Sequence, residues 1–357
     1  MNKPRVLVTG VGSNIGQGII KALRMAYPHA FVVGVDADRD AAGFFTCDAG
    51  HTVPWASEDN YVDTLLEVIG EHSVELVLVG SHPETPIVAN ARQRLESSGA
   101  VVVVGSPEAV ARCIDKMKTA EALRAAGCNA PESTIDTSPN GLAAIVKTAN
   151  FPLIVKPRSG QGSRDLHIVH DRETLSRACQ AVETPLVQAY IGDEDGEYTA
   201  AVVTDKHGAI ASSLVMHRRL HAGTTVLADI VDAPAIEAEA RKVVAALGLA
   251  GPANVQMRAI DGGAVTFEVN PRLSGTAAMR ALAGWNDVGA IVAHYLYNKP
   301  IEVGPARPGR VMRYYDEVFV PRHQIESALK NKRTDTDSRN SVTVGLLFDH
   351  AKDRGID

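Results

Sequence analysis

The first hundred residues alternate short apolar strands with helical segments. Apolar runs stand at RVLVT (5–9), FVVGVDAD (31–38), VELVLVG (74–80) and AVVVVG (100–105), and amphipathic stretches such as YVDTLLEVIGEH (61–72) separate them. Strands that are apolar on both faces and joined by helices at short spacing indicate a parallel sheet covered on both sides. We therefore predict an α/β domain at the N-terminus, with an ordinary size for a single domain.

A glycine-rich turn, GVGSNIGQG at 10–18, follows the first strand. It resembles a Rossmann-type dinucleotide fingerprint, whose glycines allow a tight turn and set a helix N-terminus against phosphate. The alternative, which we favour, is a strand-to-helix bend that binds no nucleotide. A reductase of the short-chain type would also need a Tyr-x-x-x-Lys pair. Tyr295 and Lys299 have that spacing, but they lie far down the chain.

After Pro131 the pattern changes to antiparallel hairpins. FPLIVKPRSGQGSRDLHIV (151–169) is predicted to form strand, glycine loop and strand. EYTAAVVTDKHGAIASSLVMHRRL (197–220) and ANVQMRAIDGGAVTFEVNPR (253–272) are predicted hairpins that turn at 205–208 and 261–263. This second half is therefore predicted to be α+β.

Composition argues against several classes of partner and location. The net charge of −6 gives no basic surface for nucleic acid, and 5% aromatic residues argue against stacking platforms for single strands. Four scattered cysteines fit no metal spacing and are typical of a reducing compartment. The N-terminus has no signal-peptide pattern, and no apolar run has membrane-spanning length. We expect a cytoplasmic protein.

Three polar residues alternate in FEVNPR at 267–272. Glu268, Asn270 and Arg272 share one face if this is a strand, while Phe267 and Val269 would face a core. An edge strand with a solvated face, stopped by a proline, would give the same pattern.

A partner for this row comes from the other strand of the predicted hairpin, where Gln256 can lie beside Glu268 and Asn270. These three residues offer oxygen ligands, which suit Mg²⁺ better than Zn²⁺.

Several further positions have chemistry suited to a nucleotide. Lys156 ends an apolar strand and precedes a Gly/Ser loop whose backbone amides can close over phosphates. Lys116 opens a helix and offers a second cation, and Glu197 can bind ribose hydroxyls. The remaining candidates are the loop residues Ser159, Gly160, Gly162 and Ser163, and an adenine hinge at Gln188, Ala189 and Ile191.

In this order, the motifs resemble the ATP-grasp superfamily, most closely the synthetase halves of the carbamoyl-phosphate synthase large chain. The series comprises DKMKT, PLIVKP, the glycine loop, the hinge, EYT, HAGT, NVQ and EVNPR, and covers roughly residues 5–300. The resemblance implies a Rossmann-like pre-ATP-grasp domain followed by an α+β ATP-grasp fold of two lobes. It implies phosphate contacts for Lys116 and Lys156, ribose binding by Glu197, a histidine near the phosphates at His221, metal binding by Gln256, Glu268 and Asn270, and an acyl-phosphate contact for Arg272.

The predicted organisation is a pre-ATP-grasp domain at 1–112, a small lobe at 113–188, a large lobe at 189–304 and an accessory segment at 305–357. Only one ATP-grasp unit is present, so the resemblance implies a stand-alone carboxylate–amine ligase rather than carbamoyl-phosphate synthesis. ATP and Mg²⁺, with Mn²⁺ as a substitute, are the implied cofactors. Gln188 stands where the synthase has an acid, and two extra residues precede Glu197.

The substrates are expected to be a small carboxylate and an amine. Glu84 and His82 follow the third strand, at the edge where open sheets bind ligands. Arg280, Arg310 and Arg313 are candidate contacts for a substrate carboxylate. A homodimer is the base-rate expectation. Two rival functions stay open: an NAD(P)-dependent reductase, and a non-catalytic ATP-binding protein.

Overall fold

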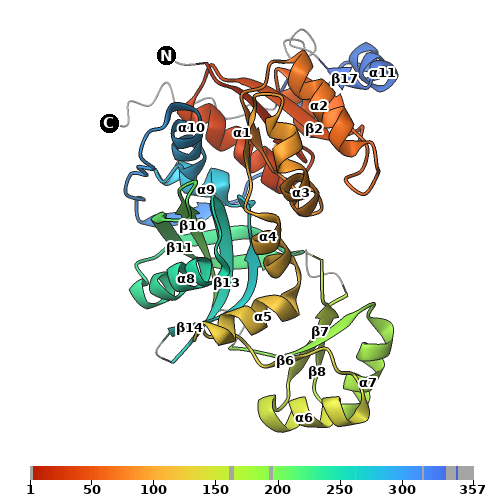
Figure 1. The fold of residues 1–357 in the computed structure, drawn as a ribbon, viewed down its shortest axis with the longest axis vertical. Helices are drawn as coiled ribbons and strands as arrows, with labels where there is room; N and C mark the ends of the chain where they lie inside the picture. The colour runs from red at the N-terminus through yellow and green to blue at the C-terminus, as the bar shows by residue number, and fades with distance from the viewer. Residues whose placement is uncertain are drawn as a thin grey trace.

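The computed structural model describes residues 3–160, 165–192, 196–261, 263–315, 317–334 and 343–344. Three layers of the fold follow one another along its length (Figure 1): a sheet built by the N-terminal residues, a large antiparallel sheet, and a small outlying lobe. None of the described helices is both long and apolar enough to cross a membrane.

The N-terminal unit is a parallel sheet with helices on both faces. Its elements are β1 (Arg5–Thr9), α1 (Asn14–Ala26), β2 (Phe31–Asp36), η1 (Ala42–Thr46), β3 (Ala49–Thr52), α2 (Tyr61–Glu71), β4 (Leu76–Leu78), α3 (Glu84–Glu96) and β5 (Val101–Val103). The strands lie in the order β3-β2-β1-β4-β5 and pair in parallel. Strand β3 and the short helix η1 were not predicted from the sequence.

Alternate residues of the strands serve two separate cores. Val6 and Val8 of β1 pack toward α1, whereas Leu7 packs with Leu65 of α2 and Val88 of α3. This two-sided burial explains why consecutive residues in the middle of β1 are all apolar. Helix α1 begins at Ser13, whose Oγ accepts hydrogen bonds from the backbone N–H groups of Ile15 and Gly16.

The small lobe is a four-stranded antiparallel sheet with two helices. It comprises β6 (Ser133–Thr134), α6 (Pro139–Ala149), β7 (Leu153–Pro157), β8 (His167–Val169), α7 (Arg172–Ala181) and β9 (Pro185–Ala189), in the order β6-β9-β7-β8. Helices α4 (Pro107–Ile114) and α5 (Lys116–Ala125) precede this lobe. The predicted hairpin of β7 and β8 is confirmed, since Leu153 pairs with Val169 in antiparallel register.

The large sheet holds the longest strands. It comprises β10 (Glu197–Thr204), β11 (Ile210–His221), β12 (Thr224–Ile230), β13 (Pro252–Ile260), β14 (Gly263–Asn270) and β15 (Gly309–Met312), in the order β14-β13-β10-β11-β12-β15. Helix α8 (Pro234–Leu247) covers one face, with Val243 and Val244 in a core shared with Val202 and Val255.

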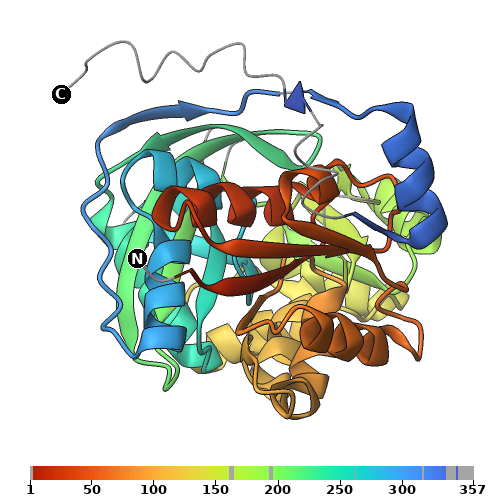
Figure 2. The same cartoon turned by 90° about the horizontal axis from the view of Figure 1, so that it is seen from above.

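The chain after β14 returns to the N-terminal sheet. Helices α9 (Ala277–Leu282) and α10 (Asp287–Tyr297) pack on α1, and Val288 and Ile291 join its core. Figure 2 shows the C-terminal segment passing from the large sheet to α11 (Arg322–Asn331) beside the N-terminal unit. Its other elements are β16 (Val318–Phe319), β17 (Arg333–Thr334) and β18 (Thr343–Val344).

Strand β17 pairs with β3 and extends the N-terminal sheet, while β15 extends the large sheet. Described residues beyond 305 therefore add strands to both sheets. The four domain boundaries stay predictions.

A buried ion pair links α9 to α10. It includes Arg280, which was predicted to contact a substrate carboxylate. Arg280 Nη2 lies 2.6 Å from Asp287 Oδ2, and both side chains are 1% exposed. Arg280 Nη1 also donates to the hydroxyls of Ser274 and Thr276. The guanidinium has no accessible face, which does not fit the predicted substrate contact.

We expect Asp287→Ala to destabilise the fold by about 3–5 kcal/mol, because Arg280 would keep a buried charge without its counter-ion. Chemical denaturation followed by circular dichroism measures this. The matched control is Asp229→Ala, which removes the partner of Arg310 in a pair more than half exposed on the arginine side and should cost about 0–1 kcal/mol. Equal losses in the two variants would contradict a structural role for the buried pair.

Candidate active site

The row predicted on β14 forms one polar cluster with its neighbouring strand. Gln256 of β13 pairs directly with Glu268, as the hairpin predicted. Glu268 Oε1 accepts a hydrogen bond from Asn270 Nδ2 at 2.8 Å and lies 3.4 Å from Gln256 Nε2. Arg272 Nη2 donates to Asn270 Oδ1 at 2.9 Å. The structure therefore brings all four residues together.

A β-bulge changes one detail of this row. The pairing shifts between Gln256 and Met257, so β14 holds an extra residue opposite that point. Phe267 was predicted to face the core, but its ring lies 5.9 Å from Lys156 Nζ. A bulge breaks the two-residue alternation of a strand, which explains the difference. Val269 is 1% exposed in the core, as predicted.

Lys156 reaches the cluster from the small lobe. It stands on β7, is 6% exposed, and its Nζ donates to Gln188 Oε1 at 2.8 Å. Gln188 Nε2 in turn donates to Ser133 Oγ at 3.0 Å, so both ends of this amide are fixed. Gln188 therefore positions the lysine from within the predicted hinge.

Lys116 reaches the same cluster from the first residue of α5. Asp115 caps this helix, because its side chain accepts hydrogen bonds from the backbone N–H groups of Met117 and Lys118. Lys116 is therefore the first residue of the helix. Lys116 Nζ donates to the Gly160 carbonyl at 2.8 Å, so it touches the start of the predicted phosphate loop. Gly160 has φ +123°, which favours glycine.

Charges around Glu268 compensate for its burial. Desolvation alone would raise the pKa of this carboxyl, but Lys116, the Asn270 amide, Lys156 and Arg218 together hold the pKa below its ordinary value. Burial has the opposite consequence for the cations. It lowers the pKa of Lys156 to about 8 and that of Arg272 to about 10, in both cases against the raising influence of Glu268. The carboxylate therefore keeps its negative charge.

The oxygen donors of the row are held by cationic side chains. Gln256 Oε1 accepts from Arg218 Nη2 at 2.8 Å, and Asn270 Oδ1 accepts from Arg272. The two guanidinium groups thus bind the amide oxygens that lie beside the Glu268 carboxylate. These same oxygens are hard ligands of the kind that Mg²⁺ prefers. The donor set fits this ion.

Arg218 and Arg258 are functional candidates that sequence reasoning missed. Arg218 Nη2 lies 2.5 Å from Glu197 Oε1, and Arg258 Nη2 lies 3.3 Å from Glu197 Oε2. Arg258 also faces Tyr190 and donates to the Ile191 carbonyl. A two-residue step from Gln256 along β13 could have identified Arg258, since such residues share a face. Both oxygens of the predicted ribose ligand are engaged in this structure.

His82 brings the N-terminal unit into the site. It follows β4 and lies within the electrostatic reach of Arg272, Glu268 and Lys116, with a hydrogen-bonding contact to Asn270. Its Nδ1 is buried and has no hydrogen-bond partner among the described residues. Desolvation, together with Arg272, lowers the pKa of this imidazole to about 4. A neutral ring therefore faces the cluster.

The other predicted substrate contacts lie elsewhere. Glu84 is 7% exposed, and its oxygens accept hydrogen bonds from Thr9, Tyr61 and Ser81 inside the N-terminal unit. This position fits an anchor for the loop after β4 rather than a substrate contact.

The remaining arginine candidates are each engaged by other groups. Arg313 donates to the carbonyls of Thr225 and Gly275. Arg310 pairs with Asp229 on the exposed edge of β15.

The remaining candidates are at the margin of the cluster or beyond it. His221 is exposed at the end of β11, where it pairs with Thr224 of β12. Ser159 is exposed at the start of the predicted loop, and Gly162 and Ser163 lie outside the described residues. In the hinge, the Ala189 N–H donates to the Glu132 carbonyl.

The glycine turn after β1 is engaged by other parts of the protein, which does not fit a phosphate-binding loop. The Gly12 N–H donates to Asp36 Oδ2 at 2.7 Å. The backbone of η1 packs onto the turn so closely that a Cβ on Gly43 would lie 2.0 Å from the Val11 carbonyl oxygen. Tyr295 is half-buried on α10, and Lys299 is exposed beyond its end. The reductase interpretation therefore finds no support, and the bend interpretation fits.

Two known families account for most of the chain. Residues 113–276 match the ATP-grasp domain, and residues 6–104 match the PylC-like N-terminal domain. The carbamoyl phosphate synthase large chain of Archaeoglobus fulgidus is 25% identical over 324 residues, which are 84% of this chain and 29% of that protein. This chain thus spans less than a third of that relative's length.

Solved structures share the fold at low sequence identity. The L-amino acid ligase from Bacillus licheniformis has a TM-score of 0.65 and 18% identity, covering 89% of this chain and 80% of that one. The biotin carboxylase domain of Hydrogenobacter thermophilus 2-oxoglutarate carboxylase, a dimer with MgADP, ADP and bicarbonate, has a TM-score of 0.66 and 14% identity. It covers 87% of this chain and 74% of that one. The predicted fold class is confirmed.

We expect His82 to stay neutral well below the pH at which an exposed histidine titrates, because burial and Arg272 oppose its protonation. Heteronuclear NMR of histidine-labelled protein, assigned with His82→Gln, measures its pKa. Arg272→Gln should move that pKa upward toward about 6.5. A wild-type pKa near 6.5 that does not respond to Arg272→Gln would show that His82 does not face the cluster.

Proposed function

We propose that this chain, which belongs to the ATP-grasp superfamily, is a carboxylate–amine ligase. It uses ATP to convert a carboxylate into an acyl phosphate, and an amine then displaces the phosphate to form a C–N bond, with ADP and phosphate as the other products. The observation that carries this proposal is the meeting of two buried lysines with Glu268 and its two amide neighbours.

Binding of a polyphosphate is the first task of the cluster. Lys116 and Lys156 approach from α5 and β7, so the two cations clamp the site from different elements. Buried ammonium groups are costly without a counter-ion, and phosphate oxygens would supply the negative charge that their burial lacks. Gln188 keeps Lys156 directed at the cluster. These residues favour an anion of high charge density such as ATP.

The metal ligands we propose are Gln256, Glu268 and Asn270. Mg²⁺ bound there would neutralise phosphate oxygens and align the transferred group. For this to happen, Arg218 and Arg272 must release the amide oxygens that they now hold. Their guanidinium groups stay nearby, where they can turn to phosphate oxygens instead.

Arg272 and His82 would act at the reacting carboxylate. Arg272 is also held by the Leu273 carbonyl, so its charge stays in place when Asn270 turns to the metal ion, before the acyl phosphate forms. The neutral His82 ring offers Nδ1, or its N–H, to the acyl group or the incoming amine. His82 comes from the PylC-like unit, so we propose that this unit contributes to substrate selection.

The proposal stops short of naming the substrates. A ligase of amino acids is among the structures with the same fold, and the carbamoyl phosphate synthase relative is more than three times longer than the matched stretch. We therefore favour small carboxylates and amines, including amino acids, as substrates. The homodimer stays a prediction.

We expect ADP release from Mg²⁺-ATP when the correct carboxylate and amine are both present. The measurement is a coupled ADP assay across amino acids and small carboxylates, singly and in pairs. Glu268→Gln should reduce the rate by about a hundred-fold or more, as loss of a preorganised electrostatic group does. Glu173→Gln, at an exposed carboxylate of α7, is the matched control and should leave the rate unchanged. Unaltered turnover in Glu268→Gln would refute the proposed site.

We also expect ATP affinity to fall as pH rises above about 8, because Lys156 loses the charge that attracts phosphate. Above the pKa, the loss approaches about ten-fold per pH unit for a site that requires the charged form. Titration calorimetry between pH 7 and 9.5 measures it. Lys156→Arg keeps its charge over this range and should flatten the profile. A flat profile in the wild-type chain would contradict the role of Lys156.

A further inference from the structure

A second cluster of ligating side chains lies at the outer edge of the N-terminal sheet. His51 of β3 and His72, which follows α2, direct their Nε2 atoms at one another over 2.6 Å, and their ring centroids are 4.8 Å apart. Glu71 Oε1 lies 3.9 Å from His72 Nε2. The ligand atoms of all three residues lie within 4.8 Å of one another. Nothing in the proposed ligase reaction uses this cluster.

We propose that His51, His72 and Glu71 bind one divalent transition-metal ion of the Zn²⁺ class. Two imidazole nitrogens and a carboxylate oxygen are typical zinc ligands. Tetrahedral ligands at zinc distances are about 3.3 Å apart. The two nitrogens must therefore separate by about 0.7 Å, and the Glu71 oxygen must move in by about 0.6 Å toward His72 and by up to about 1.5 Å overall, movements that side-chain torsions can supply. A water molecule would complete the coordination.

The surrounding contacts hold both imidazoles in place. His51 is 8% exposed on a strand that pairs with β2 on one side and β17 on the other. The His72 carbonyl accepts a hydrogen bond from Arg5 Nε, and its ring stands beside Phe31. Burial lowers the pKa of both histidines, so their rings are neutral and can ligate at neutral pH.

Two nearby arginines lower the affinity that this site can have for a cation. Arg5 and Arg333 both carry charge toward the histidines and oppose a bound cation. Arg333 Nη1, however, lies 3.1 Å from Glu71 Oε1 and can donate a hydrogen bond to that carboxylate without itself contacting the metal. Outer hydrogen bonds of this kind orient ligating carboxylates. We expect weaker binding than at a site with four protein ligands.

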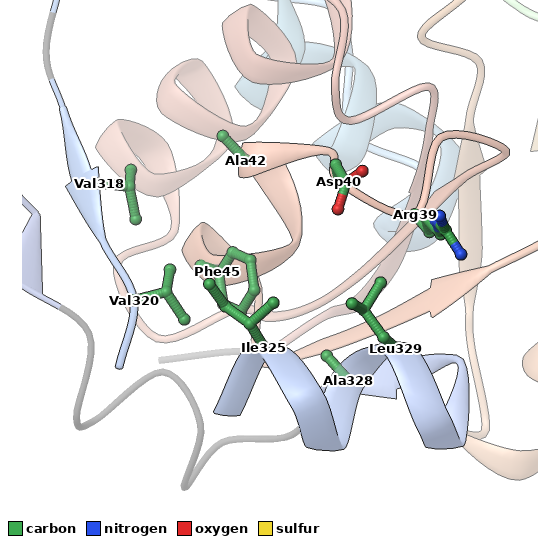
Figure 3. Close-up of a pocket in the computed structure, with 9 residues that line it drawn as sticks. All are labelled: Arg39, Asp40, Ala42, Phe45, Val318, Val320, Ile325, Ala328 and Leu329. Carbon is green, nitrogen blue, oxygen red and sulfur yellow. The ribbon is translucent and has the colours of Figure 1, made fainter. Parts of the chain in front are cut away.

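Occupancy would secure the C-terminal segment. Arg333 belongs to β17, where it pairs with His51 across the strands. Immediately before it, α11 lies over a largely apolar cavity of about 270 Å³, which Ile325 and Leu329 line together with Phe45 (Figure 3). A metal bound there would link β3 to the end of α2, and Glu71 would connect it to Arg333. These contacts would keep α11 packed on the N-terminal unit.

The first test is calorimetric titration of the chelator-treated full chain with Zn²⁺, followed by Co²⁺ absorption. We expect one ion per chain and the intense visible bands of tetrahedral Co²⁺. His51→Gln and His72→Gln should each lose this binding, Glu71→Gln should weaken it several-fold, and the exposed His170→Gln should keep it. Circular dichroism without metal checks that the variants fold. An absence of binding in the wild type, or unchanged binding in the His51→Gln/His72→Gln double variant, would overturn the proposal.

A second readout follows the C-terminal segment itself. Zn²⁺ should slow proteolytic cleavage after residue 320 in the wild type and not in His72→Gln. Cleavage at the same rate with and without Zn²⁺, in a wild-type chain shown to bind it, would overturn the link to the segment. Neither measurement depends on ATP or on the ligase reaction, so each can fail or succeed separately from the proposed function.

Discussion

The attraction between Glu268 and the cations around it is the interaction on which the site depends. Lys116 of α5, Lys156 of β7 and Arg272 of the bend after β14 would each be costly to bury alone. One carboxylate among them keeps all of them charged, and their combined field keeps that carboxylate ionised. The net charge is positive, which leaves the cluster suited to an anion. The proposed polyphosphate and its metal ion would satisfy both the surplus of cations and the oxygen donors.

Much of the site could be predicted from the sequence, because the two-residue period of a strand and the position of a hairpin turn determine which side chains lie side by side. Gln256 was expected beside Glu268 and Asn270 because it lies on the other strand of the same hairpin, and its pairing with Glu268 confirms this. The bulge that turns Phe267 toward Lys156 could not be foreseen, since it depends on how β13 and β14 pair over their length. The burial of Arg280 was equally hidden, because its partner Asp287 lies on another helix that folds back onto α1. Resemblance to a family supplied roles for residues, whereas geometry showed that Glu197 and Gln188 are held by neighbours from other strands.

The N-terminal unit is coupled to the rest of the chain in two ways. His82 enters the cluster from the loop after β4, so the cluster lies where the N-terminal unit meets the rest of the chain. Helix α10 and strand β17 come from the far end of the chain and complete the core and the edge of the N-terminal sheet. The glycine turn, which in a dinucleotide-binding fold would face a ligand, is instead covered by η1. Its glycines serve close backbone packing.

The measurement that most directly tests the central claim is titration calorimetry of ATP, with and without Mg²⁺, on the wild-type chain and on Glu268→Gln. The account predicts that Mg²⁺ strengthens ATP binding to the wild type, and that this metal-dependent gain disappears in Glu268→Gln while the fold is retained. ATP binding that is equally strong in both proteins, or that ignores Mg²⁺, would contradict the assignment of this row as the metal and phosphate site.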